Sequence, residues 1–392
     1  MLVIIFFSIA FVFALIALHP YTTYPLSLWA MTKFYGKQYI TVCPSLAPSS
    51  FSIVFCAYNE EKVLGDKIAN LAKIKESFSG QVEVLAYNDC SSDLTPHILN
   101  QHQELIKAFH GEQRTGKSTG MNCLVHNSCN DIIVFTDANS LLSESVLDEF
   151  KYAFSDPTVG LACGHLQYVN SDTATANVGK SYWKLEELIK ELEYQTGSVI
   201  GADGSLFAIR KSLYTTVPAN IIDDFFTSMG ILCSGHRLVR CEKASAYERS
   251  VNKSTEEYQR KVRISCRAFN CHRLLWPKIR QTSWLNRYKY ISHRLLRWLT
   301  IIWLAISVFF FVLALLLAFG VTTFLLSVAG LFIALLALRT LGGEGCTVFG
   351  KGNEILMAVV ATGHGVLCSL RGMYFQTWAP AQSTRMPGQQ NL

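Results

Sequence analysis

The stretch "FSIVFCAY" (Phe51 to Tyr58) decides the fold, because a run of apolar residues of this length, rich in Phe, Ile and Val, is typical of a buried strand. It is followed by "NEEKVLGDKIANLAKI" (residues 59–74), whose apolar residues recur at helical spacing. A second apolar run, "VEVLAYND" (residues 82–89), predicts a second strand. Strand and helix in alternation indicate an α/β domain.

The same alternation continues toward the C-terminus. We expect a helix near Thr95 to Leu105, a weak strand near Ile106 to Phe109, a helix from about Ser118 and a strong strand from Ile132 to Phe135. These elements predict an α/β fold with a mainly parallel sheet. Ligands of such sheets gather beyond the carboxyl ends of the strands.

Short polar runs follow three of these predicted strands. They read "AYNEE", "NDCSSDLT" and "TDANS", and they contain Asp89, Asp93 and Asp137. A single Asp after a strand is usually a cap or turn residue. Three of them at one edge of a sheet are informative, and we expect their carboxylates to converge on one crevice.

Long apolar runs predict membrane segments. Half of the residues are hydrophobic, and they are concentrated in Leu2 to Leu18, Thr300 to Phe319 and Val321 to Leu338. Each run approaches the roughly 20 apolar residues that span a bilayer core. Residues 1–20 lack the basic start and cleavage site of a signal peptide, so we predict an anchor. A fourth run, Ile355 to Leu370, is shorter and either spans, re-enters or lies at the interface.

Basic residues predict the orientation of the chain. His272 to Arg297, directly before the second apolar run, contains seven Lys and Arg residues (Arg273, Lys278, Arg280, Arg287, Lys289, Arg294 and Arg297). An excess of basic residues marks the cytoplasmic side, so residues from about 40 to 298 are expected in the cytoplasm. Within 283–298, aromatic and aliphatic residues recur at spacings of four and three. We predict an amphipathic helix in the headgroup layer; the alternative is an ordinary core helix.

Composition argues against several other classes of protein. The net charge of +6 sits largely in this basic segment, which favours anionic lipid heads as a partner and argues against nucleic acid. The 12 cysteines include no spacing suited to zinc. The segment "SYWKLEELIKELEYQ" (residues 181–195) predicts an amphipathic helix, with its acids opposite the apolar face, that serves as scaffold.

One motif favours a different function. In "HGEQRTGKSTGMN" (residues 110–122), the stretch Gly111 to Ser118 fits G-x-x-x-x-G-K-[ST], the phosphate loop of NTPases and kinases. Such a loop needs a strong apolar strand directly before it. The preceding "QELIKAFHGEQ" is a poor buried strand. A membrane-anchored NTPase or kinase is therefore kept as the alternative.

Seven motifs, taken in order, carry a resemblance. They are "AYNEE" (57–61), "NDCSSDLT" (88–95), "RTGKSTGMN" (114–122), "FTDANS" (135–140), "GADGSLFAIRKSLY" (201–214), "IIDDF" (221–225) and "RKVRI" (260–264). In this order they resemble the motifs of the family 2 inverting glycosyltransferases. The match is closest to the membrane-embedded polysaccharide-synthase branch, which includes cellulose, hyaluronan and poly-N-acetylglucosamine synthases. It covers about residues 50 to 300, and the tail "LCSLRGMYFQTWAPAQSTR" (367–385) is also similar to that branch.

The resemblance implies a division of the chain. A transmembrane anchor would occupy residues 1–20, and a GT-A type nucleotide-sugar-binding domain residues 48–275. The interfacial helix would follow at 283–298. Residues 299–376 would then form a membrane region with two spans plus a third span or re-entrant segment.

The resemblance also implies which residues hold the donor. Tyr58, Glu60 and Asp89 would lie near the base and ribose of a nucleotide sugar, which we expect to be UDP-linked, and Lys117 would lie beside its diphosphate. The family usually has two aspartates where this chain has Asn88 and Asp89. The alternative for Glu60 is a residue in the first turn of a helix, where an acid is favoured.

The family's D-x-D position reads "DAN" here. Asp137 is therefore the implied ligand of Mg²⁺ or Mn²⁺, and Asn139 is secondary because an amide oxygen is a weaker ligand for these cations than a carboxylate. The alternative for Asp137 is a structural cap.

The remaining implied residues concern the acceptor and the reaction. Asp224 in "IIDDF" would be the catalytic base, supported by Asp223; the alternative is a helix N-terminus with two favourable acids. Gly201, Ala202 and Asp203 would lie at the acceptor sugar. A plain tight turn is the alternative for this stretch.

The last motif departs from the family's Q-x-x-R-W pattern. Arg263 keeps the cation that binds pyrophosphate, Arg260 replaces the Gln, and Ile264 replaces the Trp. This departure puts processivity and the identity of the acceptor in doubt.

Together these features predict an integral membrane enzyme with a cytoplasmic catalytic domain. It would transfer a sugar with inversion from a nucleotide sugar to a glycan or lipid-linked acceptor, in polysaccharide or glycolipid synthesis. Four candidate spans are few for one chain to form a pore. The protein would therefore either glycosylate a lipid-linked acceptor or assemble as a homo-oligomer. A non-catalytic membrane scaffold is a further alternative, because of Asn88, Asn139 and Ile264.

Overall fold

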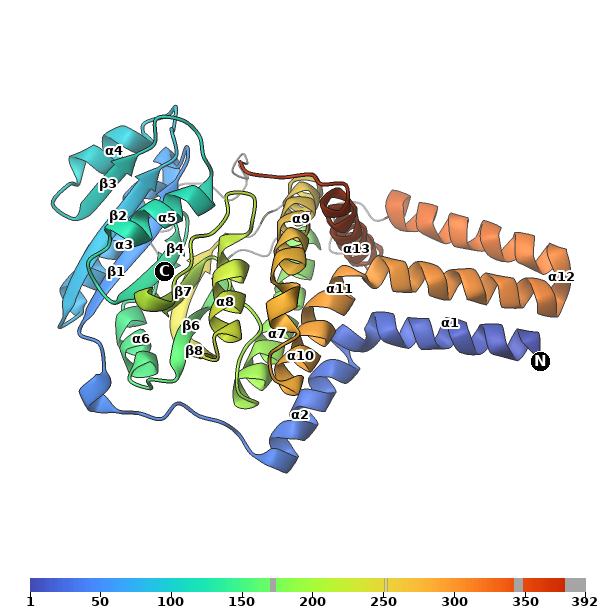
Figure 1. Cartoon of the computed structure of the whole chain (residues 1–392). Helices are drawn as coiled ribbons and strands as arrows, with labels where there is room; N and C mark the ends of the chain where they lie inside the picture. Colours follow the sequence, from blue (N-terminus) through green and yellow to red (C-terminus); the bar gives the residue numbers. More distant parts are fainter. Residues whose placement is uncertain (170–173, 250, 252, 342–347, 378–392) are drawn as a thin grey trace.

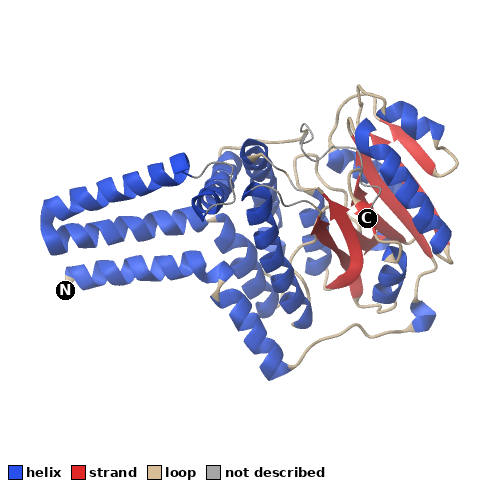
Figure 2. Ribbon diagram, turned by 180° about the vertical axis from the view of Figure 1, so that it is seen from behind, coloured by secondary structure: helices blue, strands red, loops and turns tan. Residues whose placement is uncertain are grey.

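The computed structural model has two parts, an α/β domain and a set of long helices that extends from it (Figures 1 and 2). The structure describes residues 1–169, 174–249, 251, 253–341 and 348–377. Trp378 to Arg385, the end of the tail that resembles the synthases, lies outside these residues. The N-terminus lies at the end of α1 far from the sheet (Figure 1).

The α/β domain is built on a sheet of eight strands in the order β3-β2-β1-β4-β7-β6-β8-β5. The strands are β1 (Ser50–Ala57), β2 (Gln81–Asn88), β3 (Ile106–His110), β4 (Ile132–Asp137), β5 (Leu141–Leu142), β6 (Val159–Tyr168), β7 (Leu206–Arg210) and β8 (Arg237–Glu248). The strands β3, β2, β1 and β4 are mutually parallel, while β7 is antiparallel to both β4 and β6. The predicted α/β fold with a mainly parallel sheet is confirmed.

Parallel pairing aligns the ends of the strands that carry the polar motifs. Ala57 at the end of β1 is in register with Asn88 of β2, and Cys56 is in register with Asp137 of β4. The motifs that follow these strands therefore begin at the same edge of the sheet, as ligand-binding parallel sheets require.

Helices cover both faces of the sheet. They are α3 (Glu61–Ser77), α4 (Thr95–Gln101), α5 (Lys117–Asn127), α6 (Val146–Phe154), α7 (Ala174–Gln195) and α8 (Asp223–Cys233), with a short 3₁₀ turn, η3 (Lys211–Leu213). One core joins the sheet to α3 and α6. The other joins the opposite face to α5, α8 and α9 (Ser254–Ile279). The predicted strand-helix order is confirmed from β1 to β4.

Among the residues that the structure describes, three helices are long and apolar enough to cross a membrane, and they contain the four apolar runs of the sequence. They are α1 (Leu2–Leu18), α12 (Thr300–Leu341) and α13 (Val348–Leu370). At Gly320, where φ is 81°, α12 turns back on itself and forms a hairpin beside α1 (Figure 1). This bend separates the two predicted runs, and the positive φ favours glycine there. The helix α13 packs along α9 at the base of this hairpin.

A membrane-proximal segment connects the long helices to the α/β domain. It contains η1 (His19–Tyr21) and α2 (Thr23–Tyr35) on the N-terminal side. Residues 36–49, with the 3₁₀ turn η2 (Pro44–Leu46), then lead to β1. On the C-terminal side it contains α10 (Trp284–Tyr290), the π-helical turn η4 (Ile291–Leu295) and α11 (Leu296–Trp298).

Two sequence expectations about this region are wrong in detail. Lys289 and Arg297 were expected among lipid heads, but both are buried in the protein. On α7, Glu186 and Glu193 were expected on the polar face, but both are buried and Leu188 is exposed instead. Partners across the two segments explain the burial: Arg297 pairs with Glu186, and His293 lies against Glu193. Lys289 instead donates to the backbone carbonyl oxygens of Glu193, Thr196 and Ser198.

We expect Gly120 to be needed for the packing of α5. A Cβ at Gly120 would lie 2.5 Å from the Tyr87 ring and 2.6 Å from the Cys56 sulfur, so Gly120→Ala forces α5 away from the sheet. Overpacking of this kind costs about 1–3 kcal/mol. Thermal unfolding in detergent should show a lower Tm and weaker donor binding, because Lys117 is in the first turn of the same helix.

Gly65→Ala is the matched control. Nothing lies within 4 Å of a Cβ at Gly65, which is inside α3. Alanine is favoured over glycine in a helix by up to about 1 kcal/mol, so this variant should keep or raise the Tm. Equal Tm values for the two variants would contradict the packing argument.

Candidate active site

A large cavity lies at the carboxyl ends of the parallel strands. Its volume is about 880 Å³, and its walls come from the α/β domain, α9, α13 and the tail. All thirteen predicted site residues except Gly201 line it: Tyr58, Glu60, Asp89, Lys117, Asp137, Asn139, Ala202, Asp203, Asp223, Asp224, Arg260 and Arg263. The predicted convergence of Asp89 and Asp137 on one crevice is therefore confirmed.

Asp93 does not join them. Its carboxylate accepts hydrogen bonds from the backbone N–H of Thr95, at 3.0 Å, and of Glu61, at 3.1 Å. Asp93 therefore joins the starts of α3 and α4 as a capping residue. The prediction that its carboxylate reaches the crevice is wrong, because these local backbone donors bind it first.

Asp89 shapes the loop before α5. Its carboxylate accepts from the N–H of Thr115, at 2.7 Å, and from the N–H of Gly116, at 2.9 Å. In an NTPase, the amides of a loop at this place would bind phosphate. Here an acidic side chain already occupies these two, which argues against the NTPase alternative. Gly116, with φ of 89°, has the conformation that this turn requires.

Two further predicted donor residues lie at the same end of the cavity. The guanidinium of Arg114 stacks on the ring of Tyr58 at 3.6 Å from its centroid. Glu60 is buried directly before the first turn of α3. The position of Glu60 thus satisfies both the expectation of a helix start and that of a cavity residue.

Lys117 is the central cation of the cavity. Its ammonium lies 2.7 Å from Asp137 Oδ1, 3.6 Å from Asp223 Oδ2 and 3.5 Å from the carbonyl oxygen of Gly204. Burial by itself would lower the pKa of Lys117, but the carboxylates of Asp137 and Asp223 outweigh it and raise the pKa above its usual value. Lys117 is thus held charged between two acidic motifs from distant parts of the chain.

Asp137 and Asn139 lie in one turn that opens onto the cavity. The buried Lys67 stabilises this turn by donating to Thr136 Oγ1, at 3.0 Å, and to the carbonyl oxygen of Ser140, at 2.6 Å. Burial lowers the pKa of Lys67 to about 7. The sequence analysis missed Lys67, and its only signal was a lysine among the apolar positions of α3.

The turn fits a divalent cation that is held only in part by protein. The described residues contain no group of three or more His, Cys, Asp or Glu placed to bind a metal. One carboxylate and one amide face the cavity instead, and both are oxygen ligands of the kind that Mg²⁺ and Mn²⁺ accept. A diphosphate would have to supply further oxygen ligands.

The two acids of "IIDDF" are the first residues of α8, where the helix dipole favours them. Asp224 Oδ1 accepts from the N–H of Phe225 at 2.6 Å. Asp223 Oδ2 is buried and has no hydrogen-bond partner among the described residues. Burial and the charge of Asp223 raise the pKa of Asp224 to about 7, although Lys117 opposes this shift. A carboxyl group with this pKa is suited to accept a proton near neutral pH.

The helix α9 presents arginines to the same cavity. Arg260 is paired with Glu257 on its own helix at 2.8 Å, and Arg263 lines the cavity nearby. Arg267, one turn further, donates to Ser118 Oγ at 2.8 Å and also to the carbonyl oxygen of Ile221. The sequence analysis missed Arg267, although its spacing of four from Arg263 places it on the same face of the helix.

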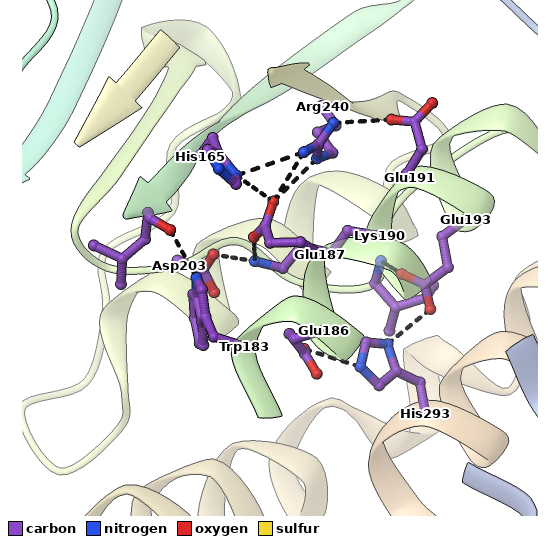
Figure 3. A network of polar contacts seen from close by, with 12 residues as sticks. His165, Trp183, Glu186, Glu187, Lys190, Glu191, Glu193, Asp203, Arg240 and His293 are labelled. Carbon is purple, nitrogen blue, oxygen red and sulfur yellow. Dashed lines mark hydrogen bonds and ion pairs between the residues drawn. The ribbon is translucent and has the colours of Figure 1, made fainter. Parts of the chain in front are cut away.

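The turn from Gly201 to Gly204 lies beside Asp224. Gly201 has φ of 95°, and a Cβ there would lie 3.0 Å from the Phe225 ring. Ala202 lines the cavity, and the carboxylate of Asp203 binds Lys190 of α7 (Figure 3). A Cβ at Gly204 would lie 2.8 Å from Asp224 Oδ2, so only glycine allows this approach.

Comparison with known proteins also gives similarities to glycosyltransferases. Residues 52–217 match the family described as Glycosyl transferase family 2. A beta-monoglucosyldiacylglycerol synthase of Trichormus variabilis is 29% identical over 164 residues, 40% of this chain and 33% of that protein. An N-acetylglucosaminyltransferase of Mesorhizobium japonicum is 23% identical over 175 residues, 42% of this chain and 40% of that protein. The matched part thus spans well under half the length of these curated relatives.

A solved structure extends the likeness in fold. The mannosyltransferase of Pyrobaculum calidifontis, in complex with GDP-Man and Mn²⁺, superposes with a TM-score of 0.69 over 93% of this chain and 99% of its own, at 17% identity. At this identity the likeness shows the fold alone. The sequence match itself contains Asp89, Lys117, Asp137 and the turn at Gly201, but it ends before Asp224 and α9. Residues 52–217 of this chain thus match the Glycosyl transferase family 2 model, and the structure has a GT-A-like fold.

Proposed function

We propose that this protein is a membrane glycosyltransferase that moves a sugar from a nucleotide sugar to a lipid-linked acceptor. The observation that carries the proposal is the meeting of Lys117, Asp137 and Asp223–Asp224 in one cavity. These residues supply the cation, the metal-binding carboxylate and the proton acceptor that a single displacement at an anomeric carbon needs.

The donor is proposed to be a UDP-sugar. Its base and ribose would lie at the end of the cavity with Tyr58 and Asp89, and its diphosphate would face Lys117 and Arg263. Arginine and lysine suit this role because both neutralise phosphate oxygens. A bound Mg²⁺ or Mn²⁺, held by Asp137 and Asn139, would neutralise the charge that develops on the leaving diphosphate.

The acceptor side of the reaction is assigned to Asp224, with Asp223 in support. Ionised Asp224 takes the proton from an acceptor hydroxyl while that oxygen attacks the anomeric carbon from the face opposite the leaving group. The bond from the anomeric carbon to the diphosphate oxygen breaks, and the configuration inverts. Asp223 Oδ2 has no hydrogen-bond partner among the described residues but lies 3.6 Å from the ammonium of Lys117, so Asp223 would support Asp224 through its charge.

A lipid-linked acceptor is favoured by the walls of the cavity. His364 of α13 and Trp298 of α11 line it, and both belong to elements at the base of the apolar helices. An acceptor headgroup at the bilayer surface would thus face Asp224 directly. We place the α/β domain on the cytoplasmic side because of the basic residues before α12. Processive synthesis of a polysaccharide, alone or as an oligomer, would need a channel and is the second possibility to test.

We expect membranes containing the protein to release nucleoside diphosphate from a UDP-sugar in the presence of Mn²⁺ and to label a lipid. UDP-, GDP- and dTDP-sugars should be compared, with product size measured by chromatography. Asp224→Asn should keep donor binding and lose at least about 100-fold in transfer, because no base remains. Unchanged turnover in this variant would remove Asp224 from the mechanism.

ATP serves as the counter-substrate in the same assay. Hydrolysis of ATP without any sugar, abolished by Lys117→Ala and unaffected by Asp224→Asn, would support the NTPase alternative. Donor binding without any release of diphosphate would support the scaffold alternative.

The rate of transfer should depend on pH through Asp224. Because the pKa of this group is raised to about 7, kcat should be near half-maximal there and fall about tenfold per pH unit below it. Asp223→Asn removes the neighbouring negative charge, so the pKa of Asp224 should fall and the acidic limb should move to lower pH. If the acidic limb of the pH profile stays in place or moves to higher pH in Asp223→Asn, the charge of Asp223 does not raise the pKa of Asp224.

The cation should bind through the turn at Asp137. Asp137→Ala should weaken Mn²⁺-dependent binding of UDP at least about tenfold, or about 1.4 kcal/mol, as measured by calorimetry. Asn139→Asp is the informative partner, because a carboxylate is a stronger ligand than an amide and should tighten Mn²⁺ binding. If neither change alters the effect of Mn²⁺, the cation site lies elsewhere.

A further inference from the structure

A buried polar network joins α7 to the membrane-proximal segment (Figure 3). At its centre is His293 of η4, which is fully buried. Its Nδ1 lies 2.7 Å from Glu193 Oε1, and its Nε2 lies 3.0 Å from Glu186 Oε1. Both glutamates belong to α7, so one imidazole connects two successive turns of that helix.

Two members of this network are glutamates with lowered pKa. Burial by itself would raise the pKa of both glutamates, but His293 and neighbouring cations outweigh it and hold their pKa below the usual value. Each ring nitrogen of His293 lies within hydrogen-bond distance of one of these carboxylates. Buried charges of this kind are stable only with all partners in place, which locks η4 against α7.

The network reaches the backbone of Ile200, the residue directly before the turn Gly201 to Gly204. The N–H of Ile200 donates to Glu193 Oε2 at 2.8 Å. Its carbonyl oxygen accepts from Arg294 Nε at 2.9 Å and from Arg294 Nη2 at 2.7 Å. Both backbone polar groups of one residue are thus held, one by α7 and one by η4.

The far end of the same turn is held as well. Asp203 binds Lys190, which pairs with Glu187 at 3.2 Å, again on α7. Directly after the second anchor, Gly204 lies against the carboxylate of Asp224 and its carbonyl oxygen faces Lys117. The position of this turn relative to Asp224 therefore depends on both anchors.

Arg294 also lies over the ring of the residue next to Asp224. Its guanidinium lies 5.8 Å from the centroid of the Phe225 ring, and Phe225 directly follows Asp224. Its third nitrogen, Nη1, lies 3.3 Å from Glu186. One side chain from the π-helical turn thus joins α7, the glycine-rich turn and the start of α8.

We propose that Arg294 is a positioning residue for sugar transfer: it fixes the turn Gly201 to Gly204 and Phe225 on either side of Asp224, and so ties the base to the membrane-proximal segment. This inference rests on the proposed function and concerns the acceptor half of that site. Without the guanidinium, the carbonyl of Ile200 loses both its donors and the turn can move away from Asp224. Displacement of a reacting group by about 1 Å can cost about 100-fold in rate.

The test is Arg294→Ala in the full-length protein in membranes. We expect kcat to fall by about 10- to 100-fold, while the Kd for UDP with Mn²⁺ stays within about twofold, because Tyr58, Asp89 and Lys117 are untouched. Arg294 lines the cavity, so added guanidinium ion at millimolar concentration can enter and should restore part of kcat. Arg294→Lys keeps the charge but loses the pair of hydrogen bonds to Ile200, so its kcat should lie between those of the wild type and Arg294→Ala.

Arg237→Ala is the matched control. Arg237 is also partly buried and also donates to backbone carbonyl oxygens, of Gly197 at 3.4 Å and of Tyr39 at 3.2 Å, and it pairs with Asp156 at 3.5 Å. Within the described residues none of these contacts is with Ile200 or Asp224. The Arg237→Ala variant should have a lower Tm and an unchanged kcat, and added guanidinium ion should not change its kcat.

The outcomes separate this inference from the proposed function. If the wild-type protein transfers sugar and Arg294→Ala keeps its kcat, the positioning role is wrong and the function stands. An equal loss of kcat in Arg294→Ala and Arg237→Ala, with no response to guanidinium, also overturns the positioning role. If the wild type releases no nucleoside diphosphate from any donor, both the proposed function and this inference fall.

Discussion

The site depends on the ion pairs of Lys117 with Asp137 and Asp223. Lys117 begins α5, Asp137 ends β4 and Asp223 begins α8, so one ammonium group draws together three elements that are far apart in the chain. Two adjacent acids at the start of α8 repel each other, and the ammonium of Lys117 and the helix dipole stabilise them. The raised pKa of Asp224 follows from this arrangement, because burial and Asp223 act on it more strongly than Lys117 does. The same arrangement of charges thus gives both an ion pair and a carboxyl group with a raised pKa.

The second constraint is the junction with the membrane helices. Charged residues that a sequence would assign to solvent or lipid heads are turned inward, and they pair with acids on α7. The apolar helices, the turn Gly201 to Gly204 and Asp224 are thus joined by one set of buried contacts. If the acceptor lies at the bilayer surface, as we propose, this arrangement would keep the distance between the membrane and Asp224 fixed.

The cavity is lined both by residues within the matched region 52–217 and by residues beyond it. The region that matches Glycosyl transferase family 2 supplies Asp89, Lys117, Asp137 and the turn at Gly201. The residues beyond it supply Asp224, the arginines of α9 and the walls from α11 and α13. Asp89, Lys117 and Asp137 thus lie within the matched region, whereas Asp224, the arginines of α9 and the walls from α11 and α13 lie outside it. The proposed acceptor is accordingly the part of the proposed function that rests most on the structure beyond the match.

The order of strands and helices from β1 to β4 could be read from the sequence, because apolar periodicity reflects local burial and each element forms within a short stretch. The apolar runs of α1 and α12 were predictable for the same reason, and glycine at position 320 marked the bend. The convergence of Asp89 and Asp137 followed from parallel pairing, which places the ends of strands at one edge. Only the tertiary structure decided that Asp93 turns away, that Lys67 and Arg267 support the site and that Glu186, Glu193 and His293 are buried together. Each of these depends on which charge lies opposite in space, and a single sequence specifies neighbours along the chain but not partners across it.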